Sequence, residues 1–167
     1  MPESKRVSIF IGALLILLGV MLSLFILVPG LSIARAWPLI FFILAAGFFL
    51  PPFIWPQSRQ GLSGMFIPGA VLAVLGFIFL YCSLTDDWAF WAFAWLLLPC
   101  SVGVGLILAA ALGGWSRVVL WVGIWMLAIS LAIYGLFAVL FGSPFIQVTG
   151  AVLVVLAGAA LVLKSIR

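Results

Sequence analysis

The ten charged side chains are the residues from which acid–base, ion-pair or transport chemistry would come. None of them falls clearly inside a long apolar run, because each maps to the end of a run or to a segment between two runs. Ionisable groups within a membrane-spanning stretch usually mark proton-coupled transport or catalysis. The sequence also lacks a Ser–His, Asp–Asp or metal-binding set. We therefore expect a protein that is not an enzyme, with no catalytic and no metal-binding residues.

Histidine and cysteine usage narrows the chemistry further. The chain has no histidine, which removes the commonest haem ligand and an imidazole for pigment binding or proton relay. Cys82 and Cys100 would differ in depth by roughly 18 Å along two apolar runs. We interpret them as unpaired apolar thiols and predict no cofactor.

Tryptophans form two stripes that bear on ligand binding. Trp88, Trp91 and Trp95 follow one another at i, i+3 and i+7, and Trp121 with Trp125 forms a second stripe. Such stripes suit stacking of a quinone, a carotenoid or a lipid ring, and they equally suit packing against lipid or other helices. Because no polar anchor accompanies them, packing is the favoured interpretation.

The residues named above lie within or between long apolar runs, which set their positions. Of the 167 residues, 68% are hydrophobic and 6% are charged, far from the balance of a soluble domain. Runs of about 20 apolar residues predict membrane-spanning helices, and we predict an all-α integral membrane protein with a single transmembrane domain of three helical hairpins. The six runs are Val7–Val28, Ile33–Leu50, Met65–Cys82, Trp88–Ala111, Trp115–Phe141 and Pro144–Leu163.

Turn chemistry separates the runs. Gly- and Pro-rich or acidic breaks stand at Pro29-Gly30, Pro51-Pro52, Gly61 to Gly64, Asp86-Asp87, Gly113-Gly114 and Gly142-Ser143-Pro144. The last break carries no charge, so five helices with a long kinked last one remain an alternative. A proline in the first turn of a new helix favours six.

The basic residues predict an orientation. If the N-terminus is cytoplasmic, six of the seven basic residues share its side, as the positive-inside rule requires. These are Lys5, Arg6, Arg59, Arg117, Lys164 and Arg167. We expect a multi-pass protein of a bacterial inner membrane with both termini in the cytoplasm, surrounded by lipid and not bound to nucleic acid. On the outer side, Arg35 faces Asp86 and Asp87, which fits either an ion pair or an ordinary solvated loop.

An internal repeat is visible in the first two hairpins. The pattern G-A-x-L-x-x-L-G begins at Gly12 and returns 57 residues later at Gly69, and Trp37 with Gly47 is matched by Trp95 with Gly105 at an offset of 58. Shared offsets predict a duplicated hairpin in parallel orientation. The repeats cover about 7–55 and 64–112, and a diverged third hairpin covers 115–163.

Small residues at helical spacing predict close helix packing. Gly12 with Gly19, and Gly69 with Gly76, lie seven residues apart and therefore on one face. A ladder every four residues lies beside an expected kink at Pro99, and it consists of Ser101, Gly105, Ala109 and Gly113. Packing within the chain is the simpler interpretation. The alternative with a functional consequence is an interface with a second copy or with another protein. Ser130 and Tyr134 in the fifth run are expected to hydrogen-bond between helices.

The repeated unit resembles the LiaI/LiaF-like transmembrane region of bacterial envelope proteins. The resemblance rests on the glycine-spaced helix followed by a helix that opens with Trp37-Pro38, over Ile11 to Leu50 and partly over Pro68 to Leu108, where Leu96 replaces the second proline. It implies a membrane fold that accompanies regulators of envelope-stress signalling.

Three functions remain open on this sequence. The first is a regulator or scaffold that acts through contacts with other membrane proteins or with itself. The second is an accessory subunit of a redox or photosynthetic membrane complex. The third is a small carrier or lipid-handling protein. A polar, water-filled cavity would favour the third, whereas a tightly packed bundle with exposed glycine faces would favour the first two.

Overall fold

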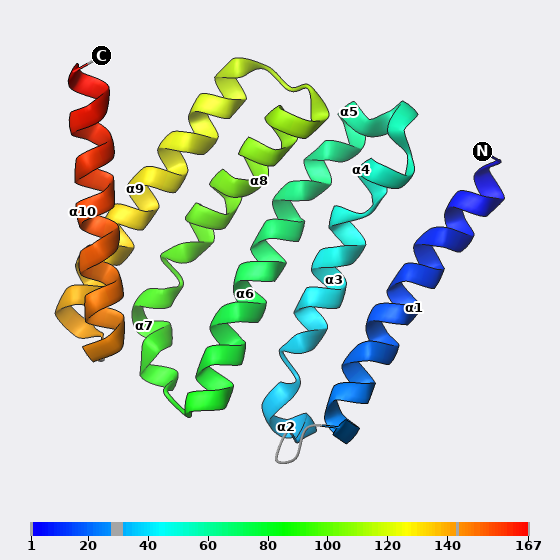
Figure 1. Cartoon of the computed structure of the whole chain (residues 1–167), viewed down its shortest axis with the longest axis horizontal. Helices are drawn as coiled ribbons and strands as arrows, with labels where there is room; N and C mark the ends of the chain where they lie inside the picture. The colour runs from blue at the N-terminus through cyan, green and yellow to red at the C-terminus, as the bar shows by residue number, and fades with distance from the viewer. Residues whose placement is uncertain (1, 28–31, 143, 167) are drawn as a thin grey trace.

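The computed structural model describes residues 2–27, 32–142 and 144–166. Within these ranges every regular element is a helix, which confirms the all-α prediction (Figure 1). The predicted turn at Pro29-Gly30, the middle residue Ser143 of the last break and the basic residue Arg167 lie outside the described residues.

Six long helices stand in one row in the order of the chain (Figure 1). Within the described residues they are α1 (Glu3–Leu27), α3 (Leu39–Phe49), α6 (Phe66–Thr85), α8 (Leu97–Gly113), α9 (Arg117–Phe141) and α10 (Pro144–Ile166). Short elements join them: α2 (Ile33–Ala36), α4 (Pro51–Ile54), η1 (Pro56–Ser58), α5 (Arg59–Leu62), η2 (Ser63–Met65), η3 (Trp88–Phe90) and α7 (Trp91–Ala94). Each long helix packs chiefly against the one before it and the one after it.

Length and apolar composition qualify three described helical stretches as membrane spans. They are Glu3–Leu24, Pro56–Thr85 and Arg117–Phe141, and the bent pair of α7 and α8 makes a fourth if it counts as one span. The other two predicted runs appear as shorter apolar stretches, Leu39–Ile54 and, in the part of α10 whose side chains are all described, Ile146–Leu156. Six full-length spans are therefore not evident from helix length alone.

The second and fourth predicted helices are both interrupted near their start. In each, a helix of four residues ends at a two-residue break, Trp37-Pro38 or Trp95-Leu96, and a longer helix follows. In the fourth run η3 precedes the short helix. The fourth run bends by 56° at this break, four residues before the kink expected at Pro99. The position follows from proline chemistry, because Pro99 lacks the N–H that would bond to the carbonyl of Trp95. The N–H of Leu98 donates to that carbonyl instead, at 2.9 Å.

The fifth and sixth runs form two separate helices. α9 ends at Phe141 and Gly142 adopts an extended conformation, after which Pro144 opens α10. The two helices fold back on each other, because a Cβ at Gly150 would lie only 2.8 Å from the carbonyl oxygen of Gly135. This arrangement excludes the alternative of one long kinked helix.

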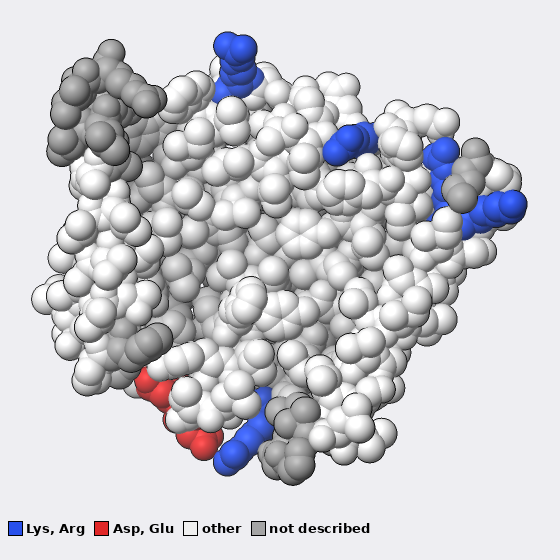
Figure 2. Space-filling view, in the orientation of Figure 1, with Lys and Arg blue, Asp and Glu red and all other residues white. Residues whose placement is uncertain are grey.

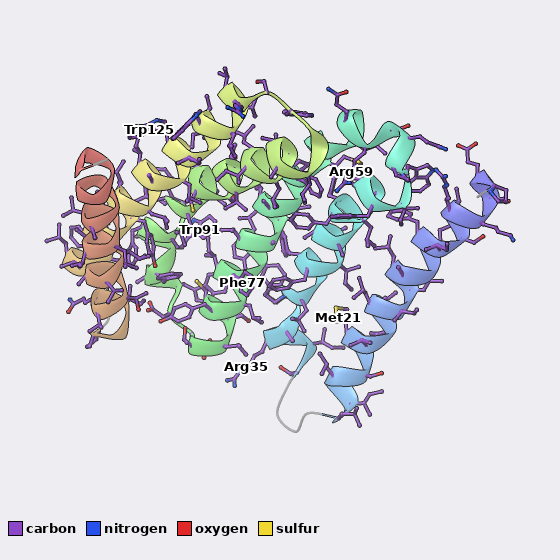
Figure 3. All side chains as sticks on the ribbon, turned by 45° about the horizontal axis from the view of Figure 1, so that its top comes forward. Met21, Arg35, Arg59, Phe77, Trp91 and Trp125 are labelled. Carbon is purple, nitrogen blue, oxygen red and sulfur yellow. The ribbon has the colours of Figure 1, made fainter. Side chains whose placement is uncertain are left out.

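The sides of the helices are apolar and the charges gather at the two ends of the row (Figure 2). We call the end at the top of Figure 1, where α1 and α9 begin and α5 lies, the upper end, and the end with α2 and the C-terminus of α6 the lower end. By these elements, Lys5, Arg59 and Arg117 belong to the upper end, and Arg35 and Asp86 to the lower end. Figure 3 labels Arg59 and Arg35 at these two ends. Large apolar side chains are exposed along the length of the row, which no soluble monomer tolerates over such an area. The separation of charge agrees with the alternation predicted from the sequence.

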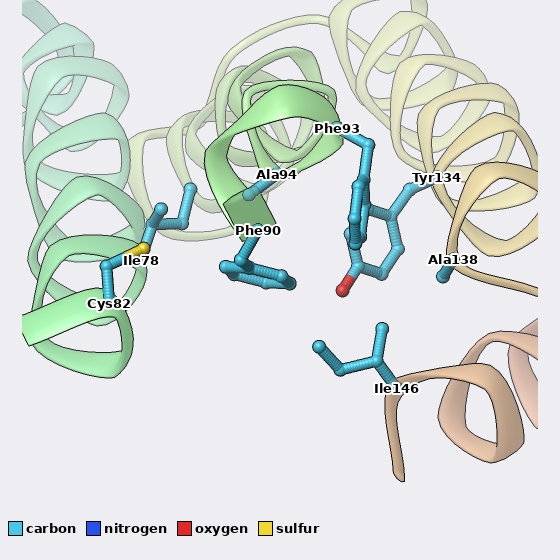
Figure 4. Close-up of a cluster of buried hydrophobic side chains, with 8 residues drawn as sticks. All are labelled: Ile78, Cys82, Phe90, Phe93, Ala94, Tyr134, Ala138 and Ile146. Carbon is cyan, nitrogen blue, oxygen red and sulfur yellow. The ribbon is translucent and has the colours of Figure 1, made fainter. Parts of the chain in front are cut away.

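The main buried cluster lies toward the lower end and ties α6, α7, α9 and α10 together (Figure 4). Phe90 and Phe93 meet edge-on, with their ring centroids 5.2 Å apart. The ring of Phe93 also contacts that of Tyr134, with 6.0 Å between centroids. The remaining members are Ile78, Cys82, Ala94, Ala138 and Ile146. Cys82 is fully buried here, and both it and Cys100 are free thiols, as predicted.

Candidate intramembrane interaction surface

The small-residue ladder of α8 faces α6 and η2 within the same chain. Ser101 and Ala109 are fully buried, and the Ser101 hydroxyl donates to the carbonyl of Leu98 at 2.6 Å. A Cβ at Gly105 would lie 2.5 Å from the Cα of Ile67, and Gly113 stands directly against Ser63. Packing within the chain therefore occupies this whole face.

The glycines of α6 receive phenylalanines from α3. A Cβ at Gly69 would meet Phe48 and Phe49 at 3.3 Å, and one at Gly76 would meet Phe41 at 3.0 Å. The second helix of the first hairpin thus packs its large side chains over the glycine face of the next hairpin.

The matching glycines of α1 have no such neighbour. A Cβ at Gly12 or Gly19 would meet no described atom within 4 Å. Near the upper end α1 is joined to the rest of the row, where Arg6 donates to the Gln57 side chain at 3.1 Å and Phe10 meets Trp55 at 6.0 Å between ring centroids. Its glycine face is open.

Two further close contacts were missed by the sequence reasoning. A Cβ at Gly103 would lie 2.7 Å from the carbonyl oxygen of Gly123, and Gly135 and Gly150 make the equally close contact between α9 and α10. Gly123 and Ser130 are seven residues apart, the same spacing as Gly12 and Gly19, so a signal for the first of these contacts was present in the sequence.

A serine from the following helix bonds a carbonyl beside each helix break. Ser83 of α6 donates to the carbonyl of Arg35 at 2.8 Å, beside the first break, and Ser130 of α9 donates to the carbonyl of Leu96 in the second. Breaks in an apolar helix persist when neighbouring side chains satisfy the freed backbone groups. The interhelical hydrogen bond expected of Ser130 is thereby confirmed, whereas Ser83 was not foreseen.

The charged side chains of Arg35 and Asp86 form an exposed ion pair at the lower end. Arg35 Nη2 and Asp86 Oδ2 are 3.9 Å apart, and their side chains are 57% and 77% exposed. Asp87 instead caps η3 by accepting from the N–H of Phe90 at 3.3 Å. The pair does join the first and second hairpins, but solvent screens it.

We expect the serine at the first break to contribute more stability than the ion pair beside it. Ser83→Ala should lower the free energy of unfolding by about 1 kcal/mol, since the carbonyl of Arg35 loses the hydrogen bond from the buried Ser83 hydroxyl. Arg35→Gln should cost less than about 0.5 kcal/mol. Thermal unfolding of both variants in the same detergent checks the order, and a larger loss for Arg35→Gln would contradict it.

The two tryptophan stripes have different surroundings. Trp91 stacks on Phe79 at 5.1 Å between ring centroids, while Trp88 and Trp95 are about half exposed. The stripe expected from Trp88 to Trp95 is divided among η3, α7 and the break, because the run does not continue as one straight helix. Trp121 and Trp125 line a lateral groove between α8 and α9.

The groove lies beside the break that precedes α8, where Leu96 and Pro99 line it. The open groove has a volume of about 470 Å³, and the side chains that line it are apolar apart from Ser130. The hydroxyl of Ser130 already donates to Leu96, so the groove offers contact area to a hydrocarbon chain without a free polar anchor from that serine. Figure 3 shows Trp125 on α9 and Trp91 on α7.

A small group of hydrogen bonds connects the segments at the upper end. The carbonyl of Gln60 accepts from the indole of Trp115 at 2.8 Å and from the hydroxyl of Ser63 at 2.7 Å. The guanidinium of Arg59 lies over the ring of Phe53 at 5.7 Å. Aromatic and basic side chains together suit the headgroup level of a bilayer.

Within the described ranges no three His, Cys, Asp or Glu side chains gather as a metal site. When the chain was compared with known protein families, with curated proteins and with solved structures, no match was found.

Proposed function

We propose that this chain is a non-enzymatic bacterial inner-membrane module that acts through protein contacts within the bilayer, as a regulator or scaffold of envelope-stress type. In this proposal all six long segments cross the membrane and the upper end faces the cytoplasm. The positive-inside distribution of Lys5, Arg6, Arg59 and Arg117 supports the orientation. The resemblance of the repeated unit supports the regulatory setting.

One observation carries the proposal. The glycine face of α6 is filled by α3, while the matching face of α1, with Gly12 and Gly19, is open. Close approach of backbones is a main source of helix association in lipid, where apolar burial alone provides no driving force. An open face of this kind, on a chain with short connecting segments, is suited to a partner inside the membrane.

Mild extraction of the tagged protein from its native membrane tests the proposal, with identification and stoichiometry of what accompanies it. A stoichiometric regulator, sensor kinase or further copy of the chain is the expected result. A stable set of redox or pigment proteins would replace the proposal by an accessory-subunit role. Recovery as a lone chain would overturn it.

A matched pair of variants sharpens the same experiment. Gly19→Leu fills the open face of α1, whereas Gly61→Leu adds the same side chain in α5, where a Cβ likewise meets no described atom within 4 Å. Gly19→Leu should lose the partner and Gly61→Leu should retain it. Equal behaviour of the two variants would show that the α1 face is not used.

Lipid handling is a second candidate, and the groove between α8 and α9 favours it. Ile129 lines this groove and is more than half exposed. Ile129→Trp should displace a bound lipid chain, measured as the loss of labelling by a photoreactive lipid in vesicles. Unchanged labelling would remove this candidate.

A further inference from the structure

Successive hairpins pack by one rule, which both junctions within the chain share. Two adjacent large side chains on the second helix of a hairpin lie over a glycine on the first helix of the next. At the first junction Phe48 and Phe49 of α3 lie over Gly69, and each would be 3.3 Å from a Cβ at that position. At the second junction the pair is Leu106 and Ile107 of α8 over Gly123, at 3.0 Å. The two pairs are 58 residues apart, the same offset as Trp37 and Trp95.

In α6 and in α1, the opposite side of the helix faces the second helix of the same hairpin. In α6 the backbone of Ile67 meets Gly105 of α8, and Ile67 is two residues from Gly69, so the two faces are about 200° apart around the helix. In α1 the side chain of Leu14 meets Gly47 of α3 at 3.9 Å, and Leu14 is two residues from Gly12. α1 is therefore turned as α6 is, with its glycine face directed to where a preceding hairpin would pack.

The far end of the row offers a face for this position. α10 contacts α9 through Gly150. Val148, Val152 and Val155 are 66%, 51% and 69% exposed, and at i, i+4 and i+7 they share the face opposite to Gly150. α10 also runs in the same direction as α3 and α8 (Figure 1). α10 could therefore pack on the first helix of another hairpin in the way that α3 packs on α6.

We propose that copies of this chain associate head to tail, with the valine face of α10 of one copy packed on the Gly12 and Gly19 face of α1 of the next. The inference rests on the proposed function and names its partner as a second copy. Neighbouring copies keep the same orientation in the membrane, because α10 is antiparallel to α1 as α3 is to α6. The contact is heterologous, so the copies form a closed ring or an open chain.

Cysteine cross-linking in native membranes tests this contact. Gly19→Cys and Val152→Cys are placed on separate, differently tagged copies that are expressed together and oxidised with a membrane-permeant reagent. A disulfide requires Cα atoms within about 7 Å, so Val148→Cys and Val155→Cys are tested in parallel to cover the register. The unsubstituted chain, which keeps Cys82 and Cys100, gives the background.

We expect a cross-linked product that carries both tags, and its loss when Gly12→Leu is added to the copy with Gly19→Cys. Since Gly12 has open space within one chain, that variant should unfold at the same temperature as its parent. Cross-linking of two Gly19→Cys copies to each other would indicate a two-fold contact and overturn the head-to-tail arrangement. Cross-linking of α1 to a different protein would overturn this inference and leave the proposed function standing. Absence of any cross-link, together with recovery as a lone chain, would overturn both.

Discussion

Phe66→Ala should lower the free energy of unfolding by about 3 kcal/mol, the usual cost of truncating a buried phenylalanine. Phe66 opens α6 and is 1% exposed. Its ring lies 5.9 Å from that of Phe49 and 5.8 Å from that of Phe53, measured between centroids. In lipid the loss comes from missing dispersion contacts around the cavity, because hydrocarbon surrounds the unfolded helix as well.

Phe77→Ala is the control for this prediction. It removes the same side chain from the same helix, but Phe77 is 64% exposed and its ring contact is with Phe42 at 4.8 Å. Its loss should cost about 1 kcal/mol. Unfolding of both variants by a denaturing detergent in mixed micelles gives the comparison, and equal losses would mean that the contact between α3, α4 and α6 is not formed in solution.

Gly105→Ala should destabilise the junction of α6 and α8 by about 2 to 3 kcal/mol. The added methyl group would lie 2.5 Å from the Cα of Ile67 and 3.0 Å from the carbonyl oxygen of Phe66. Both atoms belong to the backbone, so a rotamer change cannot relieve the overlap and the helices must separate. The measurement is the same detergent titration.

Gly47→Ala is the matched control, because Gly47 occupies the position of Gly105 in the first hairpin. A Cβ there would meet only the end of the Leu14 side chain, at 3.9 Å. It should leave stability unchanged or raise it slightly, since alanine favours a helix over glycine. A loss as large as that of Gly105→Ala would show that α1 packs more closely on α3 than described.

Helix positions followed from the sequence because apolar runs and turn residues are local signals. The break at Gly142 and Pro144 separated α9 from α10 in this way, and charge alternation placed Arg35 and Asp86 at the end opposite to Arg59. The small-residue ladder that begins at Ser101 and Gly105 indicated a packing face, although it did not indicate which helix would cover that face. The repeat stays a prediction, supported by the shared break at Trp37 and Trp95.

The remaining features depend on distances between helices, which periodicity does not encode. The kink predicted at Pro99 lies four residues earlier, at Trp95, because the helical hydrogen bond that Pro99 cannot make is the one to the carbonyl of Trp95. Ser83 was overlooked because a serine near a helix end is an ordinary residue until Arg35 is known to lie beside it. Gly12 and Gly69 have the same sequence motif, and only packing distinguishes the open glycine from the filled one.

The arrangement of the helices in a single row suits a proposed membrane insertion that proceeds one hairpin at a time during synthesis. Because each long helix contacts mainly its neighbours in sequence, a hairpin can settle against the preceding one as soon as both have left the ribosome, without waiting for distant segments. Chains dominated by such local contacts fold quickly, and domains form from the N-terminus onward as they are made. The α10 face is made after α1 to α9, so the proposed contact with another copy would form only after these helices have been made.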